Sequence, residues 1–99
     1  MERIELQYTG SKTARNRALS GVVGSGDMEV LFEPDTNGKL AISIKTSVDG
    51  STPRWQRLFD RISITGSLPS GKLVIHDFGA TPGVARLRIE QVFEEASHD

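Results

Sequence analysis

The chain has 99 residues, of which 36% are hydrophobic and 25% charged, a composition that excludes a disordered chain and indicates one folded domain. Its formal net charge of −1 gives no long-range attraction to nucleic acid or to an anionic membrane, so we expect neither as a partner. The absence of cysteine excludes disulfides, thiolate metal sites and a thiol nucleophile.

The first half of the chain alternates apolar with polar residues, which is the period of a half-buried strand. The pattern predicts strands at residues 4–8, 28–34 and 40–45, with a short apolar strand at 19–23 before the second of them. Residues 9–17 are polar and predict a loop or a flexible arm. Turn residues fill the segment between the second and third of the long strands, so we expect those two to form an antiparallel hairpin.

A helix is predicted to follow the hairpin. Thr52 is a candidate N-cap, Pro53 suits the first turn, and Gly66 is a candidate stop. Between them an apolar stripe recurs at i, i+3, i+4 and i+7, formed by Trp55, Leu58, Phe59 and Ile62. A stripe of this kind packs against a sheet, and an aromatic box for a cofactor is the weaker interpretation.

The rest of the chain predicts one more strand and a second helix. Residues 72–78 are rich in β-formers, and a turn with two glycines follows at 79–83. Beyond it, alternation at 85, 87 and 89 suggests a strand, whereas Ala85, Ile89, Val92, Phe93 and Ala96 share one helical face. Pro82 near the start and several glutamates further on favour the helix, which we predict.

Together these elements predict an α+β fold, a small and mostly antiparallel sheet with two helices packed on one face. We expect a single domain over residues 1–99, with residues 1–3 and 97–99 frayed. No apolar run approaches the length of a membrane span, and the N-terminus lacks the apolar core of a signal peptide. We therefore expect a cytoplasmic protein.

The segment from Gly21 to Asp27 (GVVGSGD) presents a single hydroxyl, that of Ser25, between two glycines. Gly24 and Gly26 remove side-chain bulk on both sides, so another molecule can approach the hydroxyl closely, and glycine reaches positive φ at low cost. An ordinary turn between strands is the simplest interpretation of such a segment. It is not a phosphate-binding P-loop, because the GK[ST] ending is absent.

Catalysis by Ser25 would need a neighbouring base and a carboxylate behind that base. His76, followed by Asp77, is the interior candidate, but Val23 and Asp27 stand where the nucleophile elbow GxSxG needs glycines. A small serine hydrolase using Ser25 and His76 is therefore a weakly supported alternative. Two distant histidines define no metal site, and no basic and aromatic residues interleave for nucleic acid. By elimination, we expect a non-catalytic component with one presentable hydroxyl.

Three segments of the chain resemble a known family: GVVGSGDMEVLFEP, TSVDGSTPRWQRLFDRI and LVIHDFGATPGVARLRIEQVFEEA. They are similar to the delta subunit of bacterial malonate decarboxylase, its acyl carrier protein, from about residue 18 onward. A looser pattern is shared with the gamma subunit of citrate lyase. In the resembled family a serine carries phosphoribosyl-dephospho-coenzyme A through a phosphodiester bond. By motif that residue is Ser25, since the GSGD context is absent at Ser11, Ser20, Ser43 and Ser47.

The resemblance implies a carrier and not an enzyme. Its arm, which makes the mature chain a phosphoprotein, ends in the thiol that this chain lacks. A transferase (alpha) subunit would exchange acetyl on the arm for malonyl and release acetate, and decarboxylase (beta and gamma) subunits would then remove carbon dioxide and regenerate the acetyl thioester. A dedicated transferase would attach the prosthetic group, and an acyl transferase would prime the arm with malonyl. The carrier of a citrate-lyase-type complex is the related alternative.

The chain departs from common acyl carrier proteins, which are helical bundles with a DSL motif. It has no such motif and is rich in β-formers around Ser25, so we expect neither that bundle nor recognition by general phosphopantetheinyl transferases. Two further features are candidate contacts. Arg54, Arg57 and Arg61 share a helix face that is either solvated or meets phosphates or an acidic partner. The turn at 79–83 is a candidate support for the arm.

Overall fold

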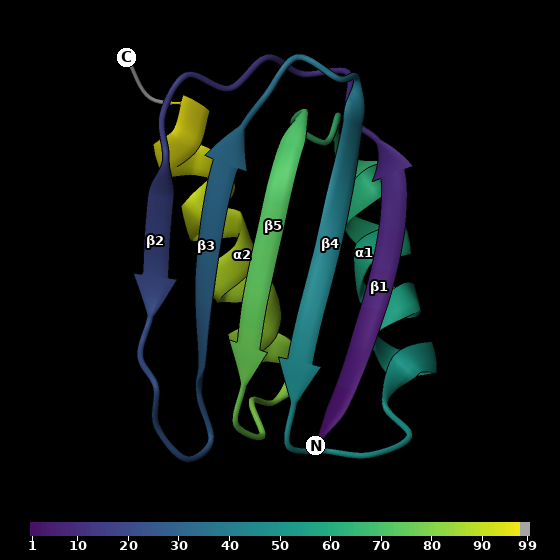
Figure 1. The fold of residues 1–99 in the computed structure, drawn as a ribbon, viewed down its shortest axis with the longest axis vertical. Coiled ribbons are helices and arrows are strands. Elements are labelled where there is room, and N and C mark those ends of the chain that lie inside the picture. The colour runs from purple at the N-terminus through teal and green to yellow at the C-terminus, as the bar shows by residue number, and fades with distance from the viewer. Residues whose placement is uncertain (98–99) are drawn as a thin grey trace.

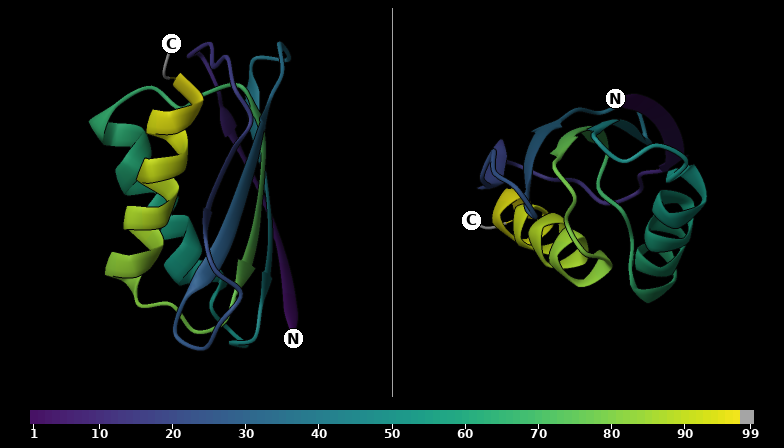
Figure 2. Two further views of the ribbon diagram at one scale, coloured as in Figure 1. Left: turned by 90° about the vertical axis from the view of Figure 1, so that its left-hand side faces the viewer. Right: turned by 90° about the horizontal axis from the view of Figure 1, so that it is seen from below.

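The computed structural model describes residues 1–97, which form one five-stranded mixed sheet and two helices within that range (Figure 1). The elements in chain order are β1 (Glu2–Thr9), β2 (Ala18–Gly21), β3 (Met28–Pro34), β4 (Lys39–Thr46), α1 (Thr52–Thr65), β5 (Gly71–Asp77) and α2 (Pro82–Ser97). The strand order is β1-β4-β5-β3-β2, with β4 and β5 parallel and the other neighbours antiparallel. Both helices cover the same face of the sheet (Figure 2). The prediction of a mostly antiparallel α+β fold, and not a helical bundle, is confirmed.

The predicted hairpin between residues 28–34 and 40–45 is wrong, because β5 lies between β3 and β4 and pairs with both. The connecting turn is bound to the start of the inserted strand. The Ser70 hydroxyl donates to Asp35 Oδ1 at 2.8 Å and accepts from the Gly38 N–H at 3.0 Å. Alternation looks the same whether two strands pair directly or through a third, so the sequence pattern does not reveal the insertion.

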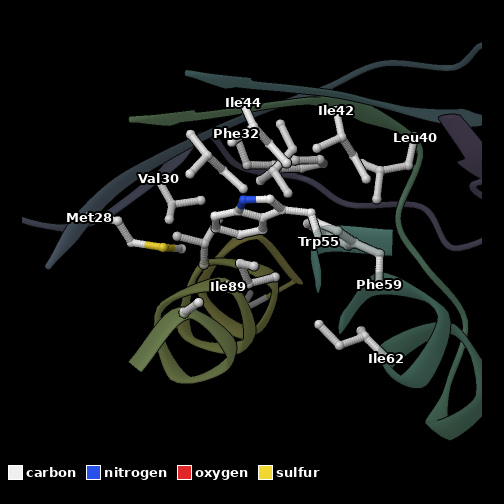
Figure 3. Packing of buried hydrophobic residues seen from close by; sticks show 14 of the residues in the cluster. Met28, Val30, Phe32, Leu40, Ile42, Ile44, Trp55, Phe59, Ile62 and Ile89 are labelled. Atoms are coloured by element: carbon white, nitrogen blue, oxygen red, sulfur yellow. The ribbon is translucent and has the colours of Figure 1, made fainter. Parts of the chain in front are cut away.

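The hydrophobic core lies between the sheet and the helices (Figure 3). Its largest fully buried side chains are apolar residues of the three central strands and of both helices: Met28, Val30, Phe32, Leu40, Ile42, Ile44, Phe59, Leu73, Ile75, Ile89 and Val92. The predicted stripe of α1 packs here, with Trp55, Phe59 and Ile62 buried and Leu58 half-buried. The indole Nε1 of Trp55 is buried with no hydrogen-bond partner among the described residues.

The ambiguous C-terminal segment is the helix α2, as predicted. Its buried residues are Ala85, Ile89, Val92 and Ala96, which share one helical face, whereas Leu87 is 54% exposed. A strand would have placed Ala85, Leu87 and Ile89 on the same side, and the exposure of Leu87 contradicts that pattern. Neither of the two described helices has the length and apolar character needed to span a membrane.

Several predicted boundaries need correction. The strand predicted at 19–23 ends at Gly21, and Val22 and Val23 are 58% and 61% exposed in the following loop. The strand predicted at 72–78 lies one residue earlier. Glu2 pairs with Thr46, so β1 begins within the segment expected to fray. At the other end α2 includes residue 97, and residues 98–99 lie outside the described range.

The predicted N-cap of α1 is also wrong. The helix begins at Thr52 itself, the cap position belongs to Ser51, and no side chain caps the helix there. The Ser51 hydroxyl instead donates to the Val48 carbonyl at 3.0 Å. Glu2, from the start of β1, accepts the backbone N–H groups of Gly50 and Ser51 at 3.3 Å each. A carboxylate distant in sequence therefore holds the segment that leads into the helix, while the Arg54 N–H donates to the Ser51 carbonyl at 3.0 Å.

We predict that Phe59→Ala lowers the free energy of unfolding by about 3–5 kcal/mol, because a fully buried aromatic side chain leaves a cavity. Val74→Ala, on the uncovered face of the sheet where the side chain is 39% exposed, should cost about 1 kcal/mol or less. Urea unfolding of both variants beside the unmodified chain measures the two costs. Equal costs would contradict this placement of the core.

Candidate functional site

Ser25 lies in the loop between β2 and β3, at the end of the molecule where both helices begin (Figure 1). The Asp27 N–H donates to the Gly24 carbonyl at 3.1 Å, which closes a β-turn with Ser25 and Gly26 at its centre. Gly26 has a φ of 78°, and no described non-glycine residue has a positive φ, so the turn is of type II. The Ser25 side chain is exposed and makes no hydrogen bond to a described residue.

The glycines around Ser25 have different roles. Gly26 supplies the positive φ, although a Cβ there would meet nothing within 4 Å. Gly24 is not at positive φ, and a Cβ there would meet only Val22 Cγ2, at 3.9 Å. Gly21 is sterically required, because a Cβ would lie 1.9 Å from the Met28 carbonyl oxygen. A side chain at position 24 or 26 would project into this open space, so both glycines leave the surroundings of Ser25 clear.

Two backbone hydrogen bonds fix this turn to the segment that follows β5. The Gly26 N–H donates to the Phe78 carbonyl at 2.8 Å, and the Phe78 N–H donates to the Asp27 carbonyl at 3.0 Å. These bonds continue the pairing of β3 with β5 beyond the strand ends. Ser25 therefore lies on a turn whose last two residues are hydrogen-bonded to the segment that follows β5.

Asp27 also ties the turn to α2. Its carboxylate accepts two hydrogen bonds from Arg88, to Oδ2 from Nη2 at 2.9 Å and to Oδ1 from Nε at 3.2 Å, and one from the Met28 N–H at 2.7 Å. The Arg88 hydrogen bond first, and the Met28 N–H second, hold the pKa of the Asp27 carboxyl below its usual 3.8. The same ion pair raises the pKa of the Arg88 guanidinium. A negative charge two residues from Ser25 is thus compensated.

A buried polar group supports the loops at this end of the sheet. Asp77 is 2% exposed and accepts from the Thr46 hydroxyl at 2.8 Å and from the Ala80 N–H at 3.0 Å. The Thr46 hydroxyl in turn accepts from the Val48 N–H at 3.0 Å. The network joins the connections that follow β4 and β5. Sequence reasoning missed it, along with the Asp27–Arg88 pair, because the partners are 31 and 61 residues apart.

The structure does not assemble a triad of Ser25, His76 and Asp77. His76 is exposed on the uncovered face of the sheet, in register with Glu29 and Lys45. Asp77, the next residue, faces the covered side and is engaged with Thr46. No hydrogen bond joins Ser25 to His76 in the described part of the chain. Within the same residues, no three His, Asp or Glu side chains are grouped to hold a metal ion.

The predicted arginine row borders a groove between α1 and α2. The groove has a volume of about 480 Å³ and is lined by Arg54, Arg57, Leu58, Arg61, Pro82, Gly83 and Arg86. The end of the turn predicted at 79–83 thus forms part of the opposite wall. A Cβ added at Gly83 would meet nothing within 4 Å. The arginine row and the turn at 79–83, which are distant in the sequence, therefore border the same groove.

Comparison with known proteins decides the family. The family model described as malonate decarboxylase delta subunit (MdcD) matches residues 15–96. A malonate decarboxylase acyl carrier protein of Klebsiella pneumoniae is 60% identical over 98 residues, which cover 99% of each chain. That of Pseudomonas aeruginosa PAO1 is 54% identical over the full length of both chains. The chain belongs to the malonate decarboxylase acyl carrier family.

A solved structure agrees with this family assignment. A chain in the crystal structure of a Pseudomonas malonate decarboxylase hetero-tetramer in complex with malonate aligns with a TM-score of 0.92 and 53% identity, covering 97% of this chain and 99% of that one. Members of the malonate decarboxylase acyl carrier family are named as carriers and not as catalytic subunits. The resemblance drawn from the sequence is therefore confirmed, and the serine hydrolase alternative is wrong.

The glycine assignment predicts different outcomes for two alanine substitutions. Gly26→Ala should lower the free energy of unfolding by about 1–2 kcal/mol, because a Cβ at positive φ is strained. Gly24→Ala should change it by less than about 0.5 kcal/mol, since its Cβ enters open space. Urea unfolding measures both, and a larger cost for Gly24→Ala would contradict the type II turn.

The Asp27–Arg88 pair predicts a pH dependence of stability. Because the folded-state pKa of Asp27 is lowered, its contribution is present above the ordinary carboxyl pKa and is lost as pH falls through the folded value. The difference in unfolding free energy between the unmodified chain and Asp27→Asn should therefore be constant at neutral pH and shrink below about pH 4. Arg88→Met, which removes the other partner, should show the same trend. A difference that is equal at pH 7 and pH 2.5 would refute the assignment.

Proposed function

We propose that this protein is the acyl carrier subunit of a cytoplasmic malonate decarboxylase complex, and that Ser25 is the residue to which its prosthetic group is attached. The observation that carries the proposal is the exposed, unpartnered Ser25 hydroxyl on a type II turn held by the sheet. The group is phosphoribosyl-dephospho-coenzyme A, joined through a phosphodiester. The family relationship supports the assignment through the shared role of carrier.

The residues at the turn fit such a group. A phosphodiester needs an accessible oxygen and room for its substituents, and positions 24 and 26 both border open space. It also carries a negative charge, which an unpaired carboxylate nearby would repel. The only acidic side chain within two residues of Ser25, that of Asp27, is paired with Arg88. No base contacts the serine among the described residues, and an anchor does not need one.

When bound, the arm supplies a terminal thiol that carries acetyl and malonyl groups as thioesters. The residues of this chain anchor it. Gly26 and Asp27 hold the turn around Ser25 on the end of the sheet, and the arm would extend from the exposed side of that turn. Attachment at one point raises the concentration of the acyl group at each partner site, since the second encounter becomes intramolecular.

The partners that this function requires follow from its chemistry. Transferase (alpha) and decarboxylase (beta and gamma) subunits would act on the loaded arm, and the hetero-tetrameric assembly of the solved relative supports a multi-subunit complex. A dedicated transferase would attach the prosthetic group, because the β-turn around Ser25 differs from the helix N-terminus of common carriers. An acyl transferase would prime the arm with malonyl.

We predict that the chain produced together with its native operon carries one added phosphoribosyl-dephospho-coenzyme A, and that Ser25→Ala carries none. Intact-mass spectrometry measures both. Ser47→Ala is the matched control, because Ser47 is also exposed but lacks the GSGD context, and it should keep the added mass. Retention of the added mass in Ser25→Ala would show that another residue is the attachment site.

Activity of the reconstituted complex should also show whether the carrier serves a malonate decarboxylase or a citrate-lyase-type complex. The reconstituted assembly should release carbon dioxide from malonate, and Ser25→Ala should abolish that release. Cleavage of citrate in place of malonate decarboxylation would instead support the citrate-lyase-type alternative.

A further inference from the structure

The groove between α1 and α2 concentrates positive charge on a chain whose overall charge is slightly negative. Four of the 12 Lys and Arg residues line it, although the chain carries a formal net charge of −1. Arg54, Arg57 and Arg61 follow one another at i, i+3 and i+7 on α1, so their side chains extend along about 10 Å of the groove. Arg86 approaches from α2.

The guanidinium groups of the α1 wall are not neutralised. Arg54, Arg57 and Arg61 make no ion pair with any described residue, and all three are exposed. Arg86 is paired with Glu90 on its own helix and is the exception. Apart from Arg86, the residues that α2 contributes to the groove are apolar or small, namely Pro82 and Gly83. A groove with three unpaired guanidinium groups is suited to a compact ligand with several negative oxygens.

The groove is connected to the attachment turn through the backbone. Gly26, next to Ser25, is hydrogen-bonded to Phe78, and Phe78 is four residues before Pro82, which lines the groove. Four residues span at most about 14 Å, so the groove wall begins within that distance of the turn's anchor. Both features lie at the end of the molecule where α1 and α2 begin (Figure 2).

We infer that this arginine groove is a binding site for a diphosphate group, and that its occupant is the diphosphate of the arm carried by Ser25. The identity of the occupant rests on the proposed function, whereas the affinity of the groove for a diphosphate does not. Two ribose units separate the phosphodiester of the arm from its diphosphate, which lets the diphosphate reach away from the turn. The arginines would hold the arm against its own carrier between visits to partner sites.

The arm is favoured over an acidic segment of a partner protein for two reasons. The site is a concave groove of about 480 Å³ with Leu58 and Pro82 between the charges, which suits a small ligand better than a flat protein surface. A tethered diphosphate is also present at high effective concentration, whereas a partner must be recruited from solution. The acidic segment is therefore the competing outcome of the test.

The first experiment uses the chain with Ser25 unmodified. Inorganic diphosphate and dephospho-coenzyme A are titrated while arginine Nε–H resonances are followed by nuclear magnetic resonance. Saturable shifts should appear at Arg54, Arg57 and Arg61, and the affinity should fall as salt rises. The triple variant Arg54→Gln, Arg57→Gln, Arg61→Gln should bind at least about tenfold more weakly, because three exposed charge contacts, each worth about two- to fivefold, are lost together.

A matched control removes the same charge from the other side of the molecule. Arg3, Lys45 and Lys72 are exposed on the uncovered face of the sheet, so Arg3→Gln, Lys45→Gln, Lys72→Gln changes the net charge equally. Its affinity for diphosphate should stay within about twofold of the unmodified chain. Equal weakening in both triple variants would overturn the site, since binding would then follow net charge alone.

The second experiment uses the loaded chain and identifies the occupant. Phosphorus resonances of the arm's diphosphate should differ from those of dephospho-coenzyme A in solution, and should return to the solution values in the groove variant but not in the control. Binding of free diphosphate with an unperturbed arm would overturn the arm as ligand. Loss of complex assembly in the groove variant, with no arginine shift in the first experiment and no phosphorus shift in the second, would overturn the site in favour of a protein interface. A chain without added mass on Ser25 would refute the proposed function, and the first experiment would still decide the diphosphate site.

Discussion

The turn around Ser25 (residues 24–27) depends on Asp27, which is held through both its backbone and its side chain. Its N–H closes the turn around Ser25, its carbonyl accepts from Phe78, and its carboxylate is bound by Arg88 and the Met28 N–H. One residue therefore connects the serine to the sheet and to α2. Loops at the ends of sheets are usually the mobile parts of a fold. Here the base of the loop is fixed, so motion of an attached arm would arise in the arm itself.

The inserted strand β5 is what brings these parts together. Because β4 and β5 are parallel, their carboxyl ends lie at the same end of the sheet, and so do the connections that follow them. β3 begins at that end because it is antiparallel to β5. If β3 had paired directly with β4, Phe78 would not lie beside Gly26, and the turn would lose its anchor. The buried contact of Asp77 with Thr46 joins the two parallel strands at the same level.

Local features of this fold could be predicted from the sequence, whereas nonlocal ones could not. The apolar stripe of α1 and the buried face of α2 follow from periodicity, and the accessibility of Ser25 follows from its glycine neighbours. The Glu2 partner of Ser51 and the Arg88 partner of Asp27 are 49 and 61 positions away, and the order of the strands depends on pairings such as that of Thr46 with Asp77, 31 positions apart. A spacing rule within one element contains no information on such partners. The choice of Ser25 as attachment residue came from family resemblance, because an exposed hydroxyl alone does not distinguish an anchor from an ordinary turn.

A carrier must retain its arm and also release it to partner subunits. The paired Asp27 carboxylate and the exposed arginines of the groove are compatible with both. The carboxylate of Asp27, two residues from Ser25, is paired with Arg88, so it would repel the phosphates of the proposed arm only weakly. The arginines of the groove are exposed to water, where each contact with an anion is screened by solvent and salt. For the proposed arm, tethering would let such individually weak contacts retain a diphosphate, since a tethered ligand cannot diffuse away. Buried arginines would hold it more tightly, but every transfer to a partner subunit would then have to break those contacts. An exposed groove near the hydrogen-bonded turn around Ser25 would therefore favour an arm that is retained at rest and readily exchanged.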